Sequence, residues 1–164
     1  MPMKDFKIVL AISNQPFAKK VIRILNSFYT ISLVTSIRDL SSKIHQENPN
    51  LIIIDYSFGG MRADEIYRGI EFLHPNVNFI VYTAREKKYL AKKLWKRRAM
   101  DYLNYTDDPV LFVQNVNKTV RWTIQRNETV ALEKTVDKIE KAILDVKKTI
   151  KNWETSFGSS NTRK

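Results

Sequence analysis

Leu51-Ile52-Ile53-Ile54-Asp55 is the stretch that decides the fold. The run is too short for a helix, and it lies between Asn-Pro-Asn and Gly59-Gly60, which both favour turns. Such a run is typical of a central parallel strand that helices cover on both faces. The carboxylate that ends it would lie at the carboxyl edge of the sheet, where open α/β sheets bind their ligands. Asp55 is therefore the first candidate site residue.

Short apolar runs alternate with helical patterns on both sides of this strand. We expect four further strands, at 7–12, 29–36, 77–83 and 100–105, and helices at 16–28, 37–47, 63–73 and 85–98. Repeated strand–helix units of this length predict an α/β fold with a doubly wound, five-stranded parallel sheet. Right-handed crossovers leave few topologies for such a sheet.

From Thr106 onward the pattern changes to that of one long helix. Thr106-Asp107-Asp108-Pro109 predicts its start, and no glycine or proline follows until Gly158. The first part carries apolar residues spaced to lie on the sheet: Phe112, Val113, Val116, Val120 and Ile124. The second part has alternating spacings of four and three, the heptad seam of a left-handed coiled coil: Leu132, Val136, Ile139, Ile143, Val146, Ile150 and Trp153.

This helix sets the predicted domain organisation and oligomeric state. We expect a domain at 1–125, a coiled-coil extension at 126–155 and a disordered tail at 156–164. The seam predicts a homo-oligomer, with a dimer as the first expectation. Its β-branched residues leave the order open, because Ile143 at one core position favours dimers whereas Ile139 at the other favours higher states. Truncation near Arg126 should weaken association.

Composition excludes several classes of function. The 164 residues contain no cysteine and only two histidines, His45 and His74, which argues against disulfides and zinc sites. We expect both histidines at the surface or at helix ends. No nucleophile–base pair or phosphate-binding loop is evident, so we do not expect an enzyme. No secretory leader or membrane span is evident either, which predicts a cytoplasmic protein that does not insert into membranes.

The net charge of +11 is concentrated in the expected helix at 85–98. Helical spacing places its basic side chains and one tryptophan on a single stripe, the predicted partner site: Arg85, Lys88, Lys92, Trp95 and Lys96. A tryptophan among lysines is typical of a contact hot spot. Alternatively, Trp95 covers its neighbours' aliphatic stems or packs on the C-terminal helix. Nucleic acid is the rival partner, but no DNA-binding module follows.

Several residues in order resemble the receiver domain of two-component response regulators, the CheY-like fold. Asp55 ends the third strand, Thr83-Ala84 ends the fourth, Asp101-Tyr102-Leu103 lies in the fifth, and Gly59-Gly60-Met61 falls where receivers often have Pro-Gly-Met. The resemblance covers roughly residues 5–125. It implies the strand order 2-1-3-4-5, a phosphoacceptor role for Asp55, and switch roles for Thr83 and Tyr102.

The sequence departs from the receiver family at two functional sites. Receivers hold Mg²⁺ with an acidic pair after the first strand, and they contact the phosphoryl group with a lysine after the fifth. Here these positions are Ser13, Asn14 and Tyr105. Neither Ser13 nor Asn14 supplies the carboxylate that Mg²⁺ prefers, so we expect weak or absent Mg²⁺ binding and no cofactor.

The resulting prediction is a pseudo-receiver that acts as a non-catalytic signalling module. It would self-associate through its C-terminal helix and bind a signalling protein through the face of the fourth helix, fifth strand and fifth helix. Two alternatives remain open. One is a working response regulator that is phosphorylated on Asp55 with dimerisation as output. The other, ranked lower, is nucleic-acid binding through the basic fourth helix.

Overall fold

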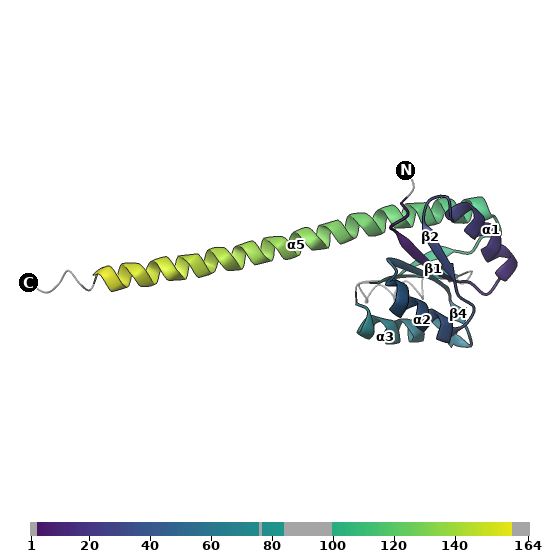
Figure 1. Cartoon of the computed structure of the whole chain (residues 1–164), viewed down its shortest axis with the longest axis horizontal. Helices are drawn as coiled ribbons and strands as arrows, with labels where there is room; N and C mark the ends of the chain where they lie inside the picture. The colour runs from purple at the N-terminus through teal and green to yellow at the C-terminus, as the bar shows by residue number, and fades with distance from the viewer. Residues whose placement is uncertain (1–2, 76, 84–99, 159–164) are drawn as a thin grey trace, which may run out of the picture. The chain divides into compact units, whose positions relative to one another are not determined.

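A five-stranded parallel sheet forms the centre of the computed structural model, which describes residues 3–75, 77–83 and 100–158 (Figure 1). Its strands are β1 (Lys7–Ala11), β2 (Thr30–Leu33), β3 (Leu51–Asp55), β6 (Asn78–Thr83) and β7 (Met100–Asn104). They are hydrogen-bonded in the order β2-β1-β3-β6-β7. The predicted order 2-1-3-4-5 is confirmed, because β6 and β7 are the fourth and fifth strands of this sheet.

Helices cover both faces of the sheet. They are α1 (Gln15–Leu25), α2 (Ile37–Glu47), α3 (Ala63–Leu73) and α5 (Pro109–Gly158). Figure 1 shows α2 and α3 together on one face and α1 on the other. The helix expected at 85–98 lies outside the described residues.

Strand β3 is buried on both faces, as its unbroken apolar run predicts. Leu51, Ile52, Ile53 and Ile54 are all fully buried. Ile52 and Ile54 belong to the core cluster that α2 and α3 cover. Because side chains alternate along a strand, Leu51 and Ile53 face the layer that contains α1. The sheet thus places the end of β3, with Asp55, at the centre of its carboxyl edge.

Aromatic rings fill the core beneath α1 and the first turns of α5. The Phe17 ring meets the Phe112 ring edge-on at 5.5 Å between centroids, and the Tyr82 ring meets Phe112 in the same way at 5.1 Å. The rings of Phe17 and Tyr82 are stacked at 6.2 Å. This cluster joins α1, β6 and α5 just below the carboxyl edge.

A short antiparallel hairpin follows β3 and was not predicted. It consists of β4 (Ser57–Phe58) and β5 (Met61–Arg62). Its two-residue loop is Gly59-Gly60, and both glycines have positive φ, +57° and +81°. Two left-handed residues in a two-residue loop are typical of a type I′ turn. We had compared these glycines with a receiver loop motif, whereas their conformation makes them a hairpin turn.

The long C-terminal helix begins where the sequence predicts. Asp108 caps it, since its Oδ1 accepts a hydrogen bond from the N–H of Val110 at 2.9 Å. The helix continues to Gly158, past the predicted end at residue 155, because no helix breaker precedes that glycine. The side-chain hydroxyl of Ser156 also donates to the carbonyl of Asn152 at 2.8 Å within this last part.

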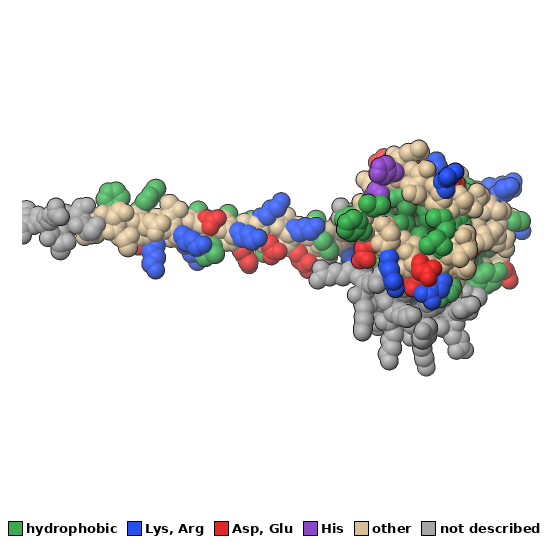
Figure 2. Space-filling model, turned by 90° about the horizontal axis from the view of Figure 1, so that it is seen from below, with side chains coloured by type: hydrophobic (Ala, Val, Ile, Leu, Met, Phe, Trp, Pro, Cys, Tyr) green, Lys and Arg blue, Asp and Glu red, His purple; other side chains and the backbone are tan. Residues whose placement is uncertain are grey.

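The chain divides into two compact units, Met1–Val120 and Arg121–Lys164. In the first unit, α5 contributes the predicted sheet-facing side chains Phe112, Val113, Val116 and Val120, all of which are buried. In the second unit, hydrophobic side chains remain exposed along the helix (Figure 2). Among the described residues, no helix is long and apolar enough to span a membrane.

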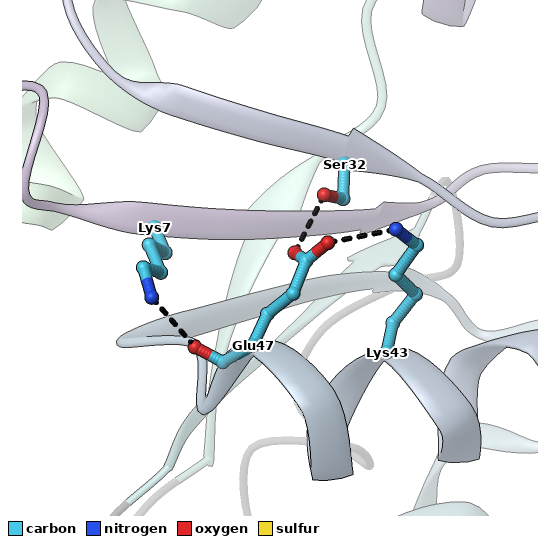
Figure 3. A network of polar contacts seen from close by, with 4 residues as sticks. All are labelled: Lys7, Ser32, Lys43 and Glu47. Carbon is cyan, nitrogen blue, oxygen red and sulfur yellow. Dashed lines mark hydrogen bonds and ion pairs between the residues drawn. The ribbon is translucent and has the colours of Figure 1, made fainter.

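A polar network ties strands β1 and β2 to α2 (Figure 3). Glu47 of α2 accepts a hydrogen bond from the Ser32 hydroxyl of β2 at 2.6 Å. Its other carboxylate oxygen lies 2.7 Å from Nζ of Lys43. Lys7 of β1 donates to the main-chain carbonyl of Glu47 at 3.0 Å. These contacts fix the C-terminal turn of α2 on β1 and β2.

Candidate functional site

Asp55 lies at the carboxyl edge of the sheet, between the loop after β1 and the end of β6. The strand register places it beside Tyr82 of β6. Its carboxylate is half-buried, and Oδ2 accepts a hydrogen bond from the backbone N–H of Ser13 at 2.6 Å. The loop after β1 thus supplies a main-chain donor to this carboxylate.

Burial dominates the electrostatics of this carboxylate. Loss of solvent raises the pKa of Asp55 above its ordinary value, while hydrogen bonds from the backbone and side chain of Ser13 oppose that rise. Among the residues that the structure describes, no basic side chain contributes to this shift. A receiver aspartate that works with a lysine has that cation at the position that Tyr105 occupies here.

The two residues at the acidic-pair positions have other tasks. Asn14 caps α1, since its Oδ1 accepts a hydrogen bond from the N–H of Phe17 at 3.1 Å. Ser13 directs an N–H donor at Asp55, where a cation would need an oxygen ligand. The Mg²⁺ ion that the fold family implies therefore does not fit the residues present at this edge.

The predicted switch residues Thr83 and Tyr102 flank the same region. Thr83 ends β6 and is buried, with 6% of its surface exposed. Tyr102 of β7 pairs with Val81 in register, and its half-buried side chain packs against the core cluster beneath α2 and α3. The fold thus brings Thr83 to the edge with Asp55, and places Tyr102 on the neighbouring strand with its ring in the core.

Tyr105 occupies the position of the receiver lysine but carries no positive charge. Its hydroxyl donates to Oδ1 of Asp107 at 2.6 Å, and its ring stacks on the Tyr82 ring at 5.5 Å. The hydrogen bond to Asp107 raises the pKa of Tyr105, and the charges of Asp107 and Asp55 add to the effect. Tyr105 is therefore a neutral side chain committed to Asp107, whereas lysine would bring a positive charge to the edge.

Tyr82 is a residue of this edge that sequence reasoning missed. Its hydroxyl donates to the carbonyl of Thr106 at 2.8 Å and accepts from the N–H of Thr106 at 3.2 Å. In sequence it reads as one more apolar residue of a buried strand. The only available signal was a polar tyrosine at the end of that strand, one position before the switch threonine.

Other predicted residues lie apart from this edge or outside the description. The partner-site residues Arg85, Lys88, Lys92, Trp95 and Lys96 are not among the described residues. The seam residues lie on α5 in the second unit, and each has 47–67% of its surface exposed: Leu132, Val136, Ile139, Ile143, Val146, Ile150 and Trp153.

The histidines require a correction. Both lie at helix ends, as expected, with His45 in the last turn of α2 and His74 at the C-cap of α3. The sequence does not predict that they meet, yet their rings lie edge-on at 5.6 Å between centroids. Their separation in sequence hides this contact, which arises because α2 and α3 pack side by side.

The sequence matches the family model of the response regulator receiver domain over residues 9–117. The chain belongs to the response regulator receiver family. The match includes the Asp55 edge and all of the sheet except the first two residues of β1. Receivers are generally signalling modules rather than enzymes. No curated protein matches this receiver in sequence.

Solved structures agree with the family at the level of fold. The signal receiver domain of a LuxO repressor protein from Vibrio parahaemolyticus has a TM-score of 0.65 at 21% identity, with 77% of this chain and 95% of that chain covered. A CheY-like receiver domain protein from Methanospirillum hungatei has a TM-score of 0.62 at 15% identity, with 74% and 98% covered.

A third similar structure is a fusion. It joins amino acids 181–211 of the yeast Spc42 trimeric coiled coil to another solved structure. Its TM-score is 0.64 at 21% identity, and the comparison covers 94% of this receiver and 98% of the fusion. That protein combines a trimeric coiled coil with a second part, and the comparison extends over most of the present chain.

Proposed function

We propose that this receiver is a signalling module whose output does not depend on Mg²⁺-assisted phosphorylation of Asp55. The observation that carries the proposal is the hydrogen bond from the Ser13 N–H to the Asp55 carboxylate. It supplies a neutral donor at the edge where a phosphoacceptor needs a metal cation beside it. We place this activity in the cytoplasm.

The chemistry of phosphoryl transfer supports this reading. A carboxylate and an incoming phosphoryl donor are both anions, so transfer depends on positive charge that offsets their repulsion. Asn14 is engaged as the cap of α1, and Tyr105 is neutral and bonded to Asp107. None of these side chains supplies the missing charge.

The proposed output is association through α5. The seam residues form an apolar stripe that is solvent-exposed in the single chain, and such stripes mark interaction surfaces in soluble proteins. Heptad spacing fits a second helix of the same kind. A dimer remains our first expectation, and the trimeric coiled coil in the similar yeast fusion makes a higher state the natural rival.

A protein partner is the second part of the proposed output. We propose that it binds the basic stripe defined by Arg85, Lys88, Lys92, Trp95 and Lys96. Affinity capture with the full chain, with Trp95→Ala and with a chain truncated at Arg126 would separate partner binding from self-association. Loss of the partner only in Trp95→Ala supports the stripe. Loss only in the truncated chain assigns the partner to α5.

Mass spectrometry tests the central claim. The intact protein is incubated with acetyl phosphate and Mg²⁺ and then weighed, beside Asp55→Asn as control. We expect no stoichiometric phosphorylation in either. If the wild type gains one phosphoryl group and Asp55→Asn does not, the alternative is established: the protein is a working response regulator. The presence of Asp55, Thr83 and Tyr102 favours that alternative.

A further inference from the structure

A groove between α2 and α3 has no part in the function proposed above. Its volume is about 280 Å³, and its walls come from apolar side chains spaced three or four residues apart on each helix: Ile37, Leu40, Ile44, Ile66, Ile70 and Leu73. Figure 2 shows hydrophobic side chains gathered at the centre of this face, with the histidines, in purple, at its edge. All these residues belong to the first unit.

Gly69 opens the groove at its middle. It lies inside α3, where glycine destabilises a helix relative to alanine. A Cβ added at this position would meet no atom within 4 Å. The packing of this domain therefore does not require glycine, and its effect is to leave space above the groove floor. A bulky side chain of a ligand fits that space.

The two ends of the groove differ in charge. His45 and His74 lie together at one end, where their imidazoles can donate N–H groups. Glu65 lies at the other end, and it shares the cation Arg62 with Asp64. Two carboxylates with one shared cation leave net negative charge there.

The helices that form the groove are parallel to each other. Each connects two strands of the parallel sheet, α2 between β2 and β3, and α3 between β3 and β6. Right-handed crossovers run both helices opposite to the strands. Their C-terminal ends therefore lie together beside the histidines, and a third helix packed antiparallel to them has a favourable dipole arrangement.

We propose that the groove binds one amphipathic helix of a partner protein, antiparallel to α2 and α3. A large apolar side chain of that helix occupies the space above Gly69. Acidic residues in its first turn accept hydrogen bonds from His45 and His74, and a basic residue in its last turn pairs with Glu65. The groove follows α2 from Ile37 to His45, about 12 Å at 1.5 Å per residue. This length matches apolar positions i, i+3, i+4 and i+7 of a bound helix.

Two strongly exposed apolar side chains lie in the last turn of α3, next to His74. Phe72 has 87% of its surface exposed and Leu73 has 68%, both in the last turn of α3. Burial of such groups is the main favourable contribution to helix-in-groove binding. The inference is independent of Asp55 and of the α5 seam, so its failure leaves the proposed function untouched.

A displayed library of helical peptides tests the proposal. The peptides are about 15 residues long, because isolated helices begin to be stable at that length. The library is selected on the full chain and depleted on Gly69→Leu, which fills the groove with a good helix former. The matched control is Arg68→Leu, which adds the same side chain at the neighbouring position outside the groove lining. Thermal melts verify that both variants fold.

We expect enriched peptides with apolar residues at helical spacing, acids in the first turn and bases in the last. Gly69→Leu should weaken them about tenfold, the effect of losing one apolar anchor, while Arg68→Leu leaves binding unchanged. Replacement of both His45 and His74 by alanine should cost about threefold, as for the loss of a hydrogen bond.

Three results would overturn the proposal. The first is that no peptide is enriched over the depleted pool. The second is that the enriched peptides lack acids in the first turn and bases in the last. The third is that they bind Gly69→Leu with the same affinity as the wild type. Light scattering adds a fourth, because a change of oligomeric state in Gly69→Leu would mean that a second copy of this chain fills the groove.

Discussion

The backbone N–H of Ser13 donates a 2.6 Å hydrogen bond to Oδ2 of Asp55, and so connects the loop after β1 to the end of β3. A main-chain donor of this kind restrains a carboxylate without adding formal charge to the edge. Burial still disfavours the ionised form, and it outweighs the hydrogen bonds from Ser13. The acidic residue at the end of β3 is thus held in place by a neutral donor.

Asp55→Asn should raise the free energy of unfolding at pH 7. We expect a gain of about 1 kcal/mol, a size that is ordinary for a single substitution. The folded chain binds the Asp55 proton more tightly than the unfolded chain, so wild-type stability falls as the pH rises above the ordinary value of 3.8. The gain should disappear at or below that pH. Urea unfolding at pH 7 and pH 3.5 measures it, and an equal gain at both values would contradict a charge effect.

Restoring the missing charges should restore Mg²⁺ binding. The triple variant Ser13→Asp, Asn14→Asp, Tyr105→Lys supplies two carboxylates and one cation at the edge, and aspartate caps a helix as well as asparagine does. We expect Mg²⁺ to shift the amide resonances of Asp55 in this variant but not in the wild type. The variant that changes Tyr105 alone is the control, and a Mg²⁺ response there would contradict our reading of Ser13 and Asn14.

Glu47→Gln should destabilise the chain with the opposite pH dependence. The hydrogen bond from Lys43, followed by that from Ser32, lowers the pKa of Glu47. Its contribution is therefore present above the ordinary value of 4.5 and is lost as the pH falls through the folded-state pKa. We expect a loss below about 1 kcal/mol at pH 7, as for exposed ion pairs. Denaturant melts from pH 7 to pH 3 should show the difference shrinking, and a constant difference would assign it to packing.

The two glycines of the β4–β5 hairpin should differ in their tolerance of alanine. Both have positive φ, so each substitution costs about 1–3 kcal/mol of backbone strain. At Gly59 the new Cβ would also lie 2.9 Å from Cγ1 of Ile37, whereas at Gly60 it meets nothing within 4 Å. We expect Gly59→Ala to lower the melting temperature more than Gly60→Ala. Equal losses would mean that Ile37 moves aside freely.

Ile143→Asp should weaken self-association, while Leu144→Asp should not. The two residues are neighbours on α5 with nearly equal exposure, 49% and 52%, but only Ile143 lies on the heptad seam. A buried aspartate in a coiled-coil core is unpaired and costly. Light scattering on the two variants and the wild type measures the effect. Equal loss in both variants, or a monomeric wild type, would refute the seam.

The apolar periodicity and the residues that begin or end each element were enough to predict the sheet. The apolar runs that end at Asp55 and Thr83 locate β3 and β6, and Pro109 locates the start of α5, because each signal lies within a few residues of the element it specifies. The turn at Gly59-Gly60 was visible in the sequence but was read as a family motif, which concealed the hairpin.

Contacts made by packing could not be predicted in this way. The hydrogen bond from Tyr82 to Thr106 joins β6 to the loop after β7, 24 residues further along the chain. The contact between His45 and His74 exists only because α2 and α3 lie together. At the carboxyl edge, Asp55 and Tyr105 could be predicted as site positions, because both align with functional positions of the receiver family. The open space above Gly69 left no trace in the sequence beyond one glycine.

The stacked rings of Tyr82 and Tyr105 have a consequence for the conditions under which this edge keeps its geometry. Ion pairs weaken as salt screens them, whereas ring stacking and hydrogen bonds between neutral groups respond little to ionic strength. Tyr82 bonds to the main chain of Thr106, and Tyr105 rests on Tyr82. The carboxyl edge is consequently held by contacts that changing salt or divalent-cation levels in a cell do little to disturb.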